Sequence, residues 1–198
     1  MKAVKRPSRG VTLIELLVVV TILGLLAVVA VPSFKRFIDV QRLRSVNAAL
    51  ITDIQFVRSE AASRNVKVIL KFDRSGGSMT CYSVFTATGD HTACDCNRAP
   101  GSVCSNPALR EIRTVQIPRD TSITLAVPTA QLPFMLRFDP ATGRVEYLTA
   151  DSAVPPDAPF VIEVINPSIG GFQTRIEPTG RPSTCSPSGQ ISGVPTCS

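Results

Sequence analysis

The hydrophobic pattern of the chain begins with one long, almost uninterrupted apolar run. Residues 11–31 contain a single ionisable side chain, Glu15, and as a helix they would be about 32 Å long, enough to cross the core of a bilayer. An acidic side chain inside such a span costs about 2.5 to 3.5 kcal/mol at mid-membrane, so Glu15 requires a partner or a function. The pattern predicts a transmembrane or filament-core helix over residues 11–32.

After Pro32 the pattern becomes amphipathic. Apolar residues recur every three or four positions, which predicts one buried helix face, and charged residues lie mostly off that face. The face consists of Phe34, Phe37, Val40, Leu43, Val46, Leu50, Ile54, Val57 and Ala61. Because Pro32 lacks a backbone donor, we expect a kink there. Residues 11 to about 63 would then form one helix of roughly 80 Å, with residues 33–64 as its amphipathic half and an end near residues 63–65.

Residues 65–198 alternate β-branched runs with turn signals, which predicts a β-rich head. The expected strands are residues 66–72, 80–86, 113–117, 122–127, 134–138, 144–148, 160–165 and 171–176. Residues 87–110 and 150–159 are predicted to be loops, and residues 177–198 an extended tail. The chain is therefore expected to be α+β: a long N-terminal helix packed on one antiparallel β head.

All the cysteines lie beyond residue 80: Cys81, Cys94, Cys96, Cys104, Cys185 and Cys197. Their even number predicts disulfides made in an oxidising periplasm, although six cysteines allow about 15 pairings. Cys185 and Cys197 bracket a Pro/Ser/Gly-rich segment, and a bridge there would stabilise the fold by roughly 3 kcal/mol. The other four would pair among themselves, with Cys94 and Cys96 too close to bridge each other. Zinc is the alternative, but this spacing lacks the usual ligand knuckle, so no metal site is expected.

The formal charge of +6 first suggests an anionic partner such as nucleic acid. However, four of the basic residues lie within the first ten positions, where no acidic residue accompanies them. Without these ten residues the chain has 17 basic and 15 acidic residues, so net charge is a poor argument for DNA binding.

Residues 10–15 read Gly-Val-Thr-Leu-Ile-Glu at the head of the apolar run. This stretch resembles the processing site of type IV prepilins and type II secretion pseudopilins, although Val11 stands where Phe is usual. The resemblance implies that residues 1–10 are a leader, that a prepilin peptidase cuts between Gly10 and Val11, and that the new amine of Val11 is methylated. It also implies that Glu15 pairs with the amino group of a neighbouring subunit. An ordinary secretory signal or a plain membrane anchor is the alternative, but a signal has a shorter apolar core and neither explains Glu15.

Two further stretches carry a narrower resemblance. Residues 53–65 read D-I-Q-F-V-R-S-E-A-A-S-R-N, and Phe138-Asp139-Pro140 precedes Gly143-Arg144. Both resemble the GspH/FimT family of minor pilins and pseudopilins, which implies a type IV pilin-like fold and a subunit that helps to initiate or build a type IV pilus. The implied location is the bacterial inner membrane, as a single-pass protein with its head in the periplasm, and then the pilus, among other pilin subunits. A GspH-like pseudopilin of the type II secretion system is the alternative, but the cysteine-rich head resembles the pilus branch more.

A DNA-binding subunit in DNA uptake is a second alternative. Some FimT-like proteins bind DNA through a C-terminal Gly-Arg-x-Arg stretch, and here the matching residues are Gly180-Arg181-Pro182-Ser183, without the second arginine. Arg175 is the nearest substitute. Phosphate binding needs clustered basic residues and single strands need aromatic platforms, so DNA contact by Arg175 and Arg181 is not favoured over two ordinary surface arginines.

No enzymatic motif is present. The one histidine, His91, lies in a predicted loop, and the sequence has neither a Gly-x-Ser-x-Gly nor a phosphate-binding glycine-rich loop. We therefore expect a structural protein without catalytic residues or a cofactor.

Overall fold

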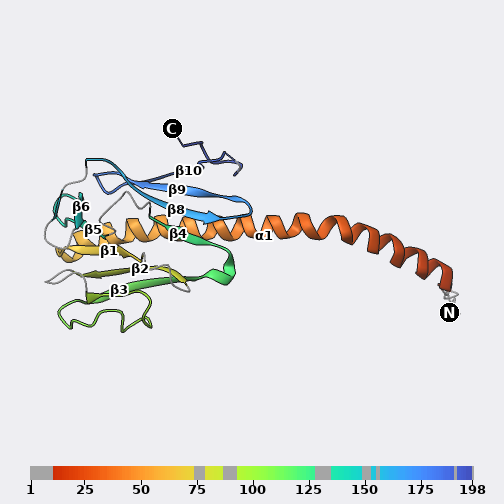
Figure 1. The fold of residues 1–198 in the computed structure, drawn as a ribbon, viewed down its shortest axis with the longest axis horizontal. Coiled ribbons are helices and arrows are strands. Elements are labelled where there is room, and N and C mark those ends of the chain that lie inside the picture. Colours follow the sequence, from red (N-terminus) through yellow and green to blue (C-terminus); the bar gives the residue numbers. More distant parts are fainter. Residues whose placement is uncertain are drawn as a thin grey trace, which may run out of the picture. The chain divides into compact units, whose positions relative to one another are not determined.

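The computed structural model describes residues 11–73, 79–86, 93–127, 135–148, 153–154, 157–189 and 191–197. It divides into two compact units, Met1–Asp39 and Val40–Ser198. The division falls within the predicted amphipathic half of the helix. Figure 1 labels the elements in chain order.

The described part of the first unit is mainly helical. Helix α1 (Leu13–Arg64) begins there and continues into the second unit, which confirms the single long helix expected from the sequence. No single helix in the described residues is long and apolar enough to cross a membrane. Two parts of α1, Leu13–Val28 and Ser33–Arg64, are bent by 42° relative to each other. Taken together, they have the length and composition of a membrane span.

In the second unit, the helical residues bury one face. Leu43, Leu50, Ile54, Val57 and Ala61 are at most 1% exposed, as their spacing predicts. The two phenylalanines expected at the start of this buried face are not buried: Phe34 is 64% exposed and Phe37 is 58% exposed. They precede the second unit, so the head's core reaches the helix only from Val40 onward.

The helix ends where polar residues predicted its end. Asn65 adopts a left-handed backbone conformation (φ 53°), and its N–H donates to the carbonyl of Ala62. The N–H of Val66 donates to the carbonyl of Ala61 at 3.2 Å. This pair of hydrogen bonds is a Schellman C-cap, and asparagine is one of the few residues that accept its backbone geometry.

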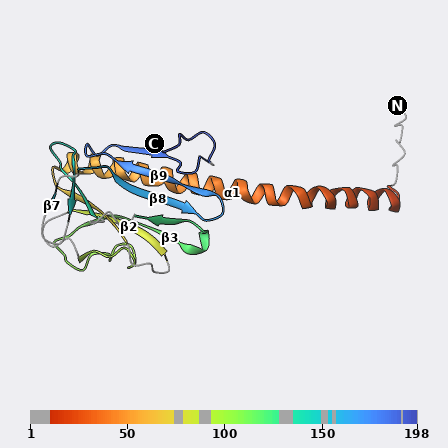
Figure 2. The ribbon, with the colours of Figure 1, turned by 45° about the horizontal axis from the view of Figure 1, so that its top comes forward.

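Two antiparallel sheets form the rest of the head. The first has the order β3-β2-β1-β5-β6-β7, and its strands are β1 (Val68–Phe72), β2 (Met79–Thr86), β3 (Glu111–Pro118), β5 (Met135–Phe138), β6 (Val145–Leu148) and β7 (Ala153–Val154). The second has the order β10-β9-β8-β4, with β4 (Thr124–Ala126), β8 (Phe160–Asn166), β9 (Gly170–Ile176) and β10 (Pro182–Cys185). A 3-10 turn, η2 (Arg119–Thr121), lies between β3 and β4. Figure 2 shows β8 and β9 beside the C-terminal half of α1.

The eight predicted strands are present, and the sequence missed two others. Strand β7 lies inside the predicted loop 150–159, and β10 lies inside the predicted extended tail. The tail is in fact part of the head: Ile191 is 3% exposed in the core, and Arg44 Nη2 donates to the carbonyl of Ser192 at 2.7 Å. Proline at the first position of β10 is compatible with an edge strand, because the edge needs no donor there.

Buried polar groups tie the helix to both sheets. Asp53 is 1% exposed, accepts a hydrogen bond from the Tyr82 hydroxyl at 2.6 Å, and forms an ion pair with Arg113 at 2.9 Å. Burial and the bond to Asp53 raise the pKa of Tyr82, which keeps its hydroxyl protonated as a donor. On the other sheet, the Thr174 hydroxyl donates to the Asn47 side chain at 2.9 Å.

Three disulfides connect the six cysteines, and they follow the predicted division. Cys185 pairs with Cys197, and the other four pair as Cys81–Cys96 and Cys94–Cys104. Cys81–Cys96 ties residues 93–110 to β2, and Cys94–Cys104 closes that segment on itself. The Gln116 side chain also donates to the carbonyl of Cys96 at 2.7 Å. A covered edge strand is protected from pairing with other chains.

Candidate functional site

Helix α1 begins with an N-terminal cap. Thr12 precedes the first helical residue; its hydroxyl accepts a hydrogen bond from the N–H of Glu15 at 3.3 Å, and its carbonyl accepts one from Leu16 at 3.1 Å. Glu15 therefore occupies the third helical position of a Thr-x-x-Glu capping sequence. An acidic side chain in the first turn is also favoured by the helix dipole. Gly10 lies outside the described residues, so the expected cleavage point is seen only from its Val11 side.

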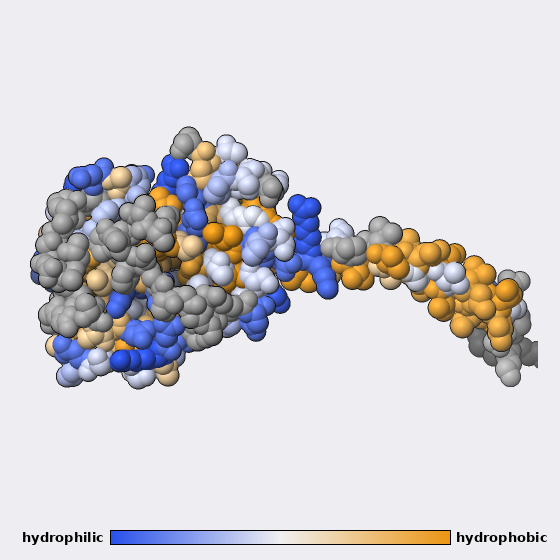
Figure 3. All heavy atoms as spheres, viewed as in Figure 1, coloured by the Kyte–Doolittle hydropathy of each residue, from blue (hydrophilic) through white to orange (hydrophobic). Residues whose placement is uncertain are grey.

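Apart from Glu15 and Thr21, the first helical half is apolar on all sides from Leu13 to Val31. Between Leu13 and Phe37 its large described apolar side chains are 48% to 82% exposed. The hydroxyl of Thr21 donates to the carbonyl of Leu17 at 2.7 Å and so needs no outside partner. The face seen in Figure 3 is correspondingly hydrophobic along this helical half. An exposed apolar surface of this extent marks contact with lipid or protein.

Glu15 is the only ionisable residue between Val11 and Phe34. Its carboxylate has no hydrogen bond or ion pair with another residue in the part of the chain that the structure describes. The expected partner, a neighbouring subunit's amine, would come from outside this chain.

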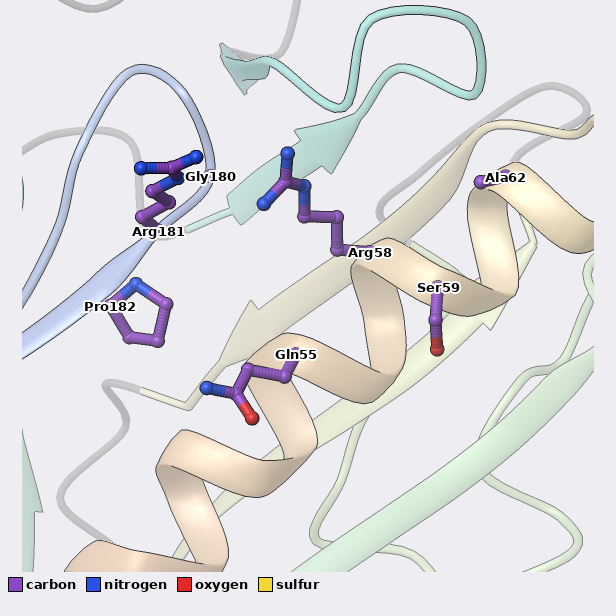
Figure 4. Close-up of a pocket in the computed structure, with 7 residues that line it drawn as sticks. All are labelled: Gln55, Arg58, Ser59, Ala62, Gly180, Arg181 and Pro182. Carbon is purple, nitrogen blue, oxygen red and sulfur yellow. The ribbon is translucent and has the colours of Figure 1, made fainter.

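The head contains a second candidate site where two distant stretches meet. A hollow of about 570 Å³ is lined by Gln55, Arg58, Ser59, Ala62, Gly180, Arg181 and Pro182. Figure 4 shows Arg58 projecting from α1 toward the loop that carries Gly180 and Arg181. No lining residue is acidic, so the hollow carries two positive charges.

Two glycines allow these stretches to approach one another. A Cβ atom on Gly143 (φ 66°) would lie 2.7 Å from Nε of Arg58, and one on Gly180 (φ 76°) would lie 2.5 Å from the carbonyl oxygen of Gly143. Both positions thus require glycine for space and for backbone conformation. The sequence marked Gly143 and Gly180 only as parts of two separate motifs, and their contact was not predicted.

The two predicted DNA-contact residues lie on paired segments: β9 and β10 are antiparallel, with Arg175 opposite Ser183, two residues after Arg181. Arg181 lines the hollow, but Arg175 does not. Thr174, its neighbour on β9, points toward Asn47 of the helix, so Arg175 lies on the opposite face of the sheet, where its Nε donates to Gln173 at 3.2 Å. The residue that joins Arg181 is Arg58, a charged residue of the helix that the sequence does not link to the C-terminal motif.

No group of three or more His, Cys, Asp or Glu residues that could hold a metal ion occurs in the described ranges. All six cysteines are in disulfides, so none of them is a thiolate that could bind zinc. His91 lies outside the described residues.

Comparisons with known proteins bear on the N-terminal region and the fold. The family defined as the prokaryotic N-terminal methylation motif matches residues 5–31. Two crystal structures of the type IV minor pilin FimU from Pseudomonas aeruginosa strain PAO1 are similar. One (space group P65) is 18% identical with a TM-score of 0.45 and covers 77% of this chain and 98% of that chain. The other (space group P21) is 19% identical with a TM-score of 0.48 and covers 78% and 95%. No curated protein matches the sequence significantly.

The chain combines a prokaryotic N-terminal methylation motif, a long N-terminal helix and a disulfide-bonded antiparallel β head. This is the fold class that the sequence predicted, and it is consistent with the GspH/FimT resemblance.

Proposed function

We propose that the chain is a minor pilin-type structural subunit that helps to initiate or build a type IV pilus. Residues 1–10 are removed by a prepilin peptidase, the new amine of Val11 is methylated, and the head is exported to the periplasm. The pairing of all six cysteines supports an oxidising compartment for the head. The match of the methylation motif to residues 5–31 supports the processing step.

The observation that carries the proposal is Glu15: a carboxylate with no partner in the described residues, in the first turn of a helix whose large described side chains are apolar and exposed from Leu13 to Val31. In lipid or in a filament core, such a charge is tolerated only beside an opposite charge. The methylated amine of Val11 on an adjacent subunit is a cation of the right sign at the same end of the helix. The pair would cancel both charges and align the two subunits.

Filament incorporation in the native host tests the proposal. Glu15→Ala and Glu15→Gln are both expected to reach the membrane, melt like the wild type and be depleted from sheared filaments by about tenfold or more, since each removes the charge. Leu25→Met is a control that keeps the helix apolar. Intact mass of the membrane-extracted protein should show loss of residues 1–10 and one added methyl group. Normal incorporation of both Glu15 variants would contradict the proposal, and a mature N-terminus near Val31 would mean an ordinary signal peptide.

A further inference from the structure

Two arginines line the hollow in the head, and neither is paired with an acidic side chain of the described residues. Arg58 is half-buried and Arg181 is exposed. Neither guanidinium has a hydrogen bond or ion pair with another residue in the described ranges, although three other arginines of the head form ion pairs with Asp or Glu. A guanidinium that has lost part of its water gains from a bound oxyanion, and its planar fork matches a carboxylate.

The fold holds Arg58 in place. Its guanidinium lies against Gly143, and Cδ of the same side chain lies near Gly180. The two turns that carry these glycines are fixed to each other, because the N–H of Val145 donates to the carbonyl of Pro178 at 3.0 Å. The Asp139 carboxylate further fixes its turn by accepting bonds from the N–H of Ala141 and the N–H and hydroxyl of Thr142. A cation held this way loses little conformational freedom when it binds an anion.

We infer that this hollow binds a carboxylate presented by a neighbouring protein subunit, with Arg58 and Arg181 as its two cationic contacts. The side-chain amide of Gln55 adds a donor at the same wall. The inference rests on the proposed function, which supplies neighbouring subunits, and it adds a head-to-head contact that is separate from the Glu15 pair.

A single carboxylate fits the hollow better than the backbone of a nucleic acid. Nucleic acid presents a row of phosphates and is bound by a row of cations, with aromatic platforms where it is single-stranded. Among the described residues that line the hollow there are two cations and no aromatic side chain, and Arg175 is not one of them. The charge of residues 11–198 is also near neutral.

The binding chemistry can be measured on the processed full chain in detergent micelles. We would follow the arginine Nε–H NMR signals during titration with sodium acetate, and separately with sodium phosphate and with a short DNA duplex. Acetate should shift the signals of Arg58 and Arg181 saturably, and Arg58→Gln or Arg181→Gln should weaken it by about tenfold. The matched control is Arg42→Gln, which removes an exposed cation from the same helix and should change nothing.

Three results would overturn the inference: no saturable shift with acetate, equal acetate affinity in all variants, or tighter binding of phosphate. Tight duplex binding that is lost in Arg58→Gln and Arg181→Gln would assign the hollow to nucleic acid instead. Because Arg181 is exposed, its variant remains informative even if Arg58→Gln folds poorly.

Filament incorporation then assigns the carboxylate to a subunit. Charge reversal in Arg181→Glu should reduce incorporation about fivefold or more, whereas Arg42→Glu should not. If the Glu15 variants are depleted but Arg181→Glu is not, the hollow has no role in assembly and the proposed function still stands. If all of them incorporate normally, the proposed function itself fails.

Discussion

The two halves of helix α1 have the same secondary structure and opposite surroundings. From Leu13 to Phe37 the described large apolar side chains are 48% to 82% exposed, whereas Leu43, Leu50, Ile54 and Val57 are at most 1% exposed. Apart from Glu15 and Thr21, the first half is apolar all round from Leu13 to Val31, so no orientation hides its side chains from water. The second half concentrates its apolar residues on one face, which the two sheets of the head cover. One half is complete within the chain, and the other needs partners from outside it.

Two carboxylates of the helix, Asp53 and Glu15, show the same contrast between a part that is complete within the chain and a part that is not. Asp53 is neutralised within the chain by Arg113 and accepts a hydrogen bond from Tyr82. Glu15 has no such partner in the described residues. A carboxylate in an apolar environment requires a cation, which is why the proposed function gives Glu15 a partner on another subunit.

The same substitution in the two halves should break the comparison most clearly. Leu50→Ala removes a side chain that is 1% exposed and leaves a cavity, which should lower the free energy of unfolding of the head by about 2 to 5 kcal/mol. Leu25, on the same helix, is 68% exposed, so Leu25→Ala should leave the thermal melt of the head unchanged. Circular dichroism melts of both full-length variants in one detergent measure the difference. Equal shifts would mean that the first half packs on the head.

Sequence reasoning succeeded where a single local pattern decides the structure. The helix, its end at Arg64, eight of the strands and the division of the cysteines follow from periodicity, turn residues and spacing. Sequence reasoning missed the elements whose structure depends on a contact with a distant part of the chain. Two residues of β7 have no pattern of their own, β10 has a proline and two small polar residues, and both become strands only because β6 and β9 lie beside them.

The candidate site shows the same limit. The start of the helix could be identified from Gly10 to Glu15 alone, because its residues are consecutive. The hollow in the head could not, because Arg58, Gly143 and Arg181 are far apart in the sequence and meet only through the fold. The sequence paired Arg181 with Arg175 because they are close along the chain, but of the two only Arg181 lines the hollow, together with Arg58 of the helix.

The second prediction concerns the tail that closes the head. Replacing both cysteines in Cys185→Ser/Cys197→Ser should lower the free energy of unfolding by about 3 kcal/mol, because the unfolded chain loses a cross-link between residues 12 apart. The loop they bracket carries Ile191 into the core, so its release would also expose apolar surface of the kind that the first helical half shows. Denaturant unfolding of the full chain measures the loss, with Ser188→Ala in the same exposed loop as the control. An unchanged midpoint would show that the tail packs without its bridge.

The smallest expected effect concerns pH and the disulfide-bonded loop. Desolvation alone would raise the pKa of the Glu111 carboxyl. Its carboxylate, however, accepts hydrogen bonds from the N–H of Gly101, the hydroxyl of Thr114 and the N–H of Val103. Together these bonds outweigh desolvation, and the pKa lies below its ordinary value. A carboxyl whose pKa is lowered by folding stabilises the protein above its unfolded pKa, and that contribution disappears as the pH falls through the folded pKa. The head should therefore lose stability on acidification from about pH 5 downward, and Glu111→Gln should flatten this part of the profile. Thermal melts from pH 7 to pH 3 measure both proteins, and the gap in melting temperature between them should narrow as the pH falls. Substituting Glu146, whose partner Arg137 lies on the neighbouring strand, provides a matched loss of charge outside the loop. A gap that stays constant with pH would mean that Glu111 holds the loop through hydrogen bonds that do not depend on its charge.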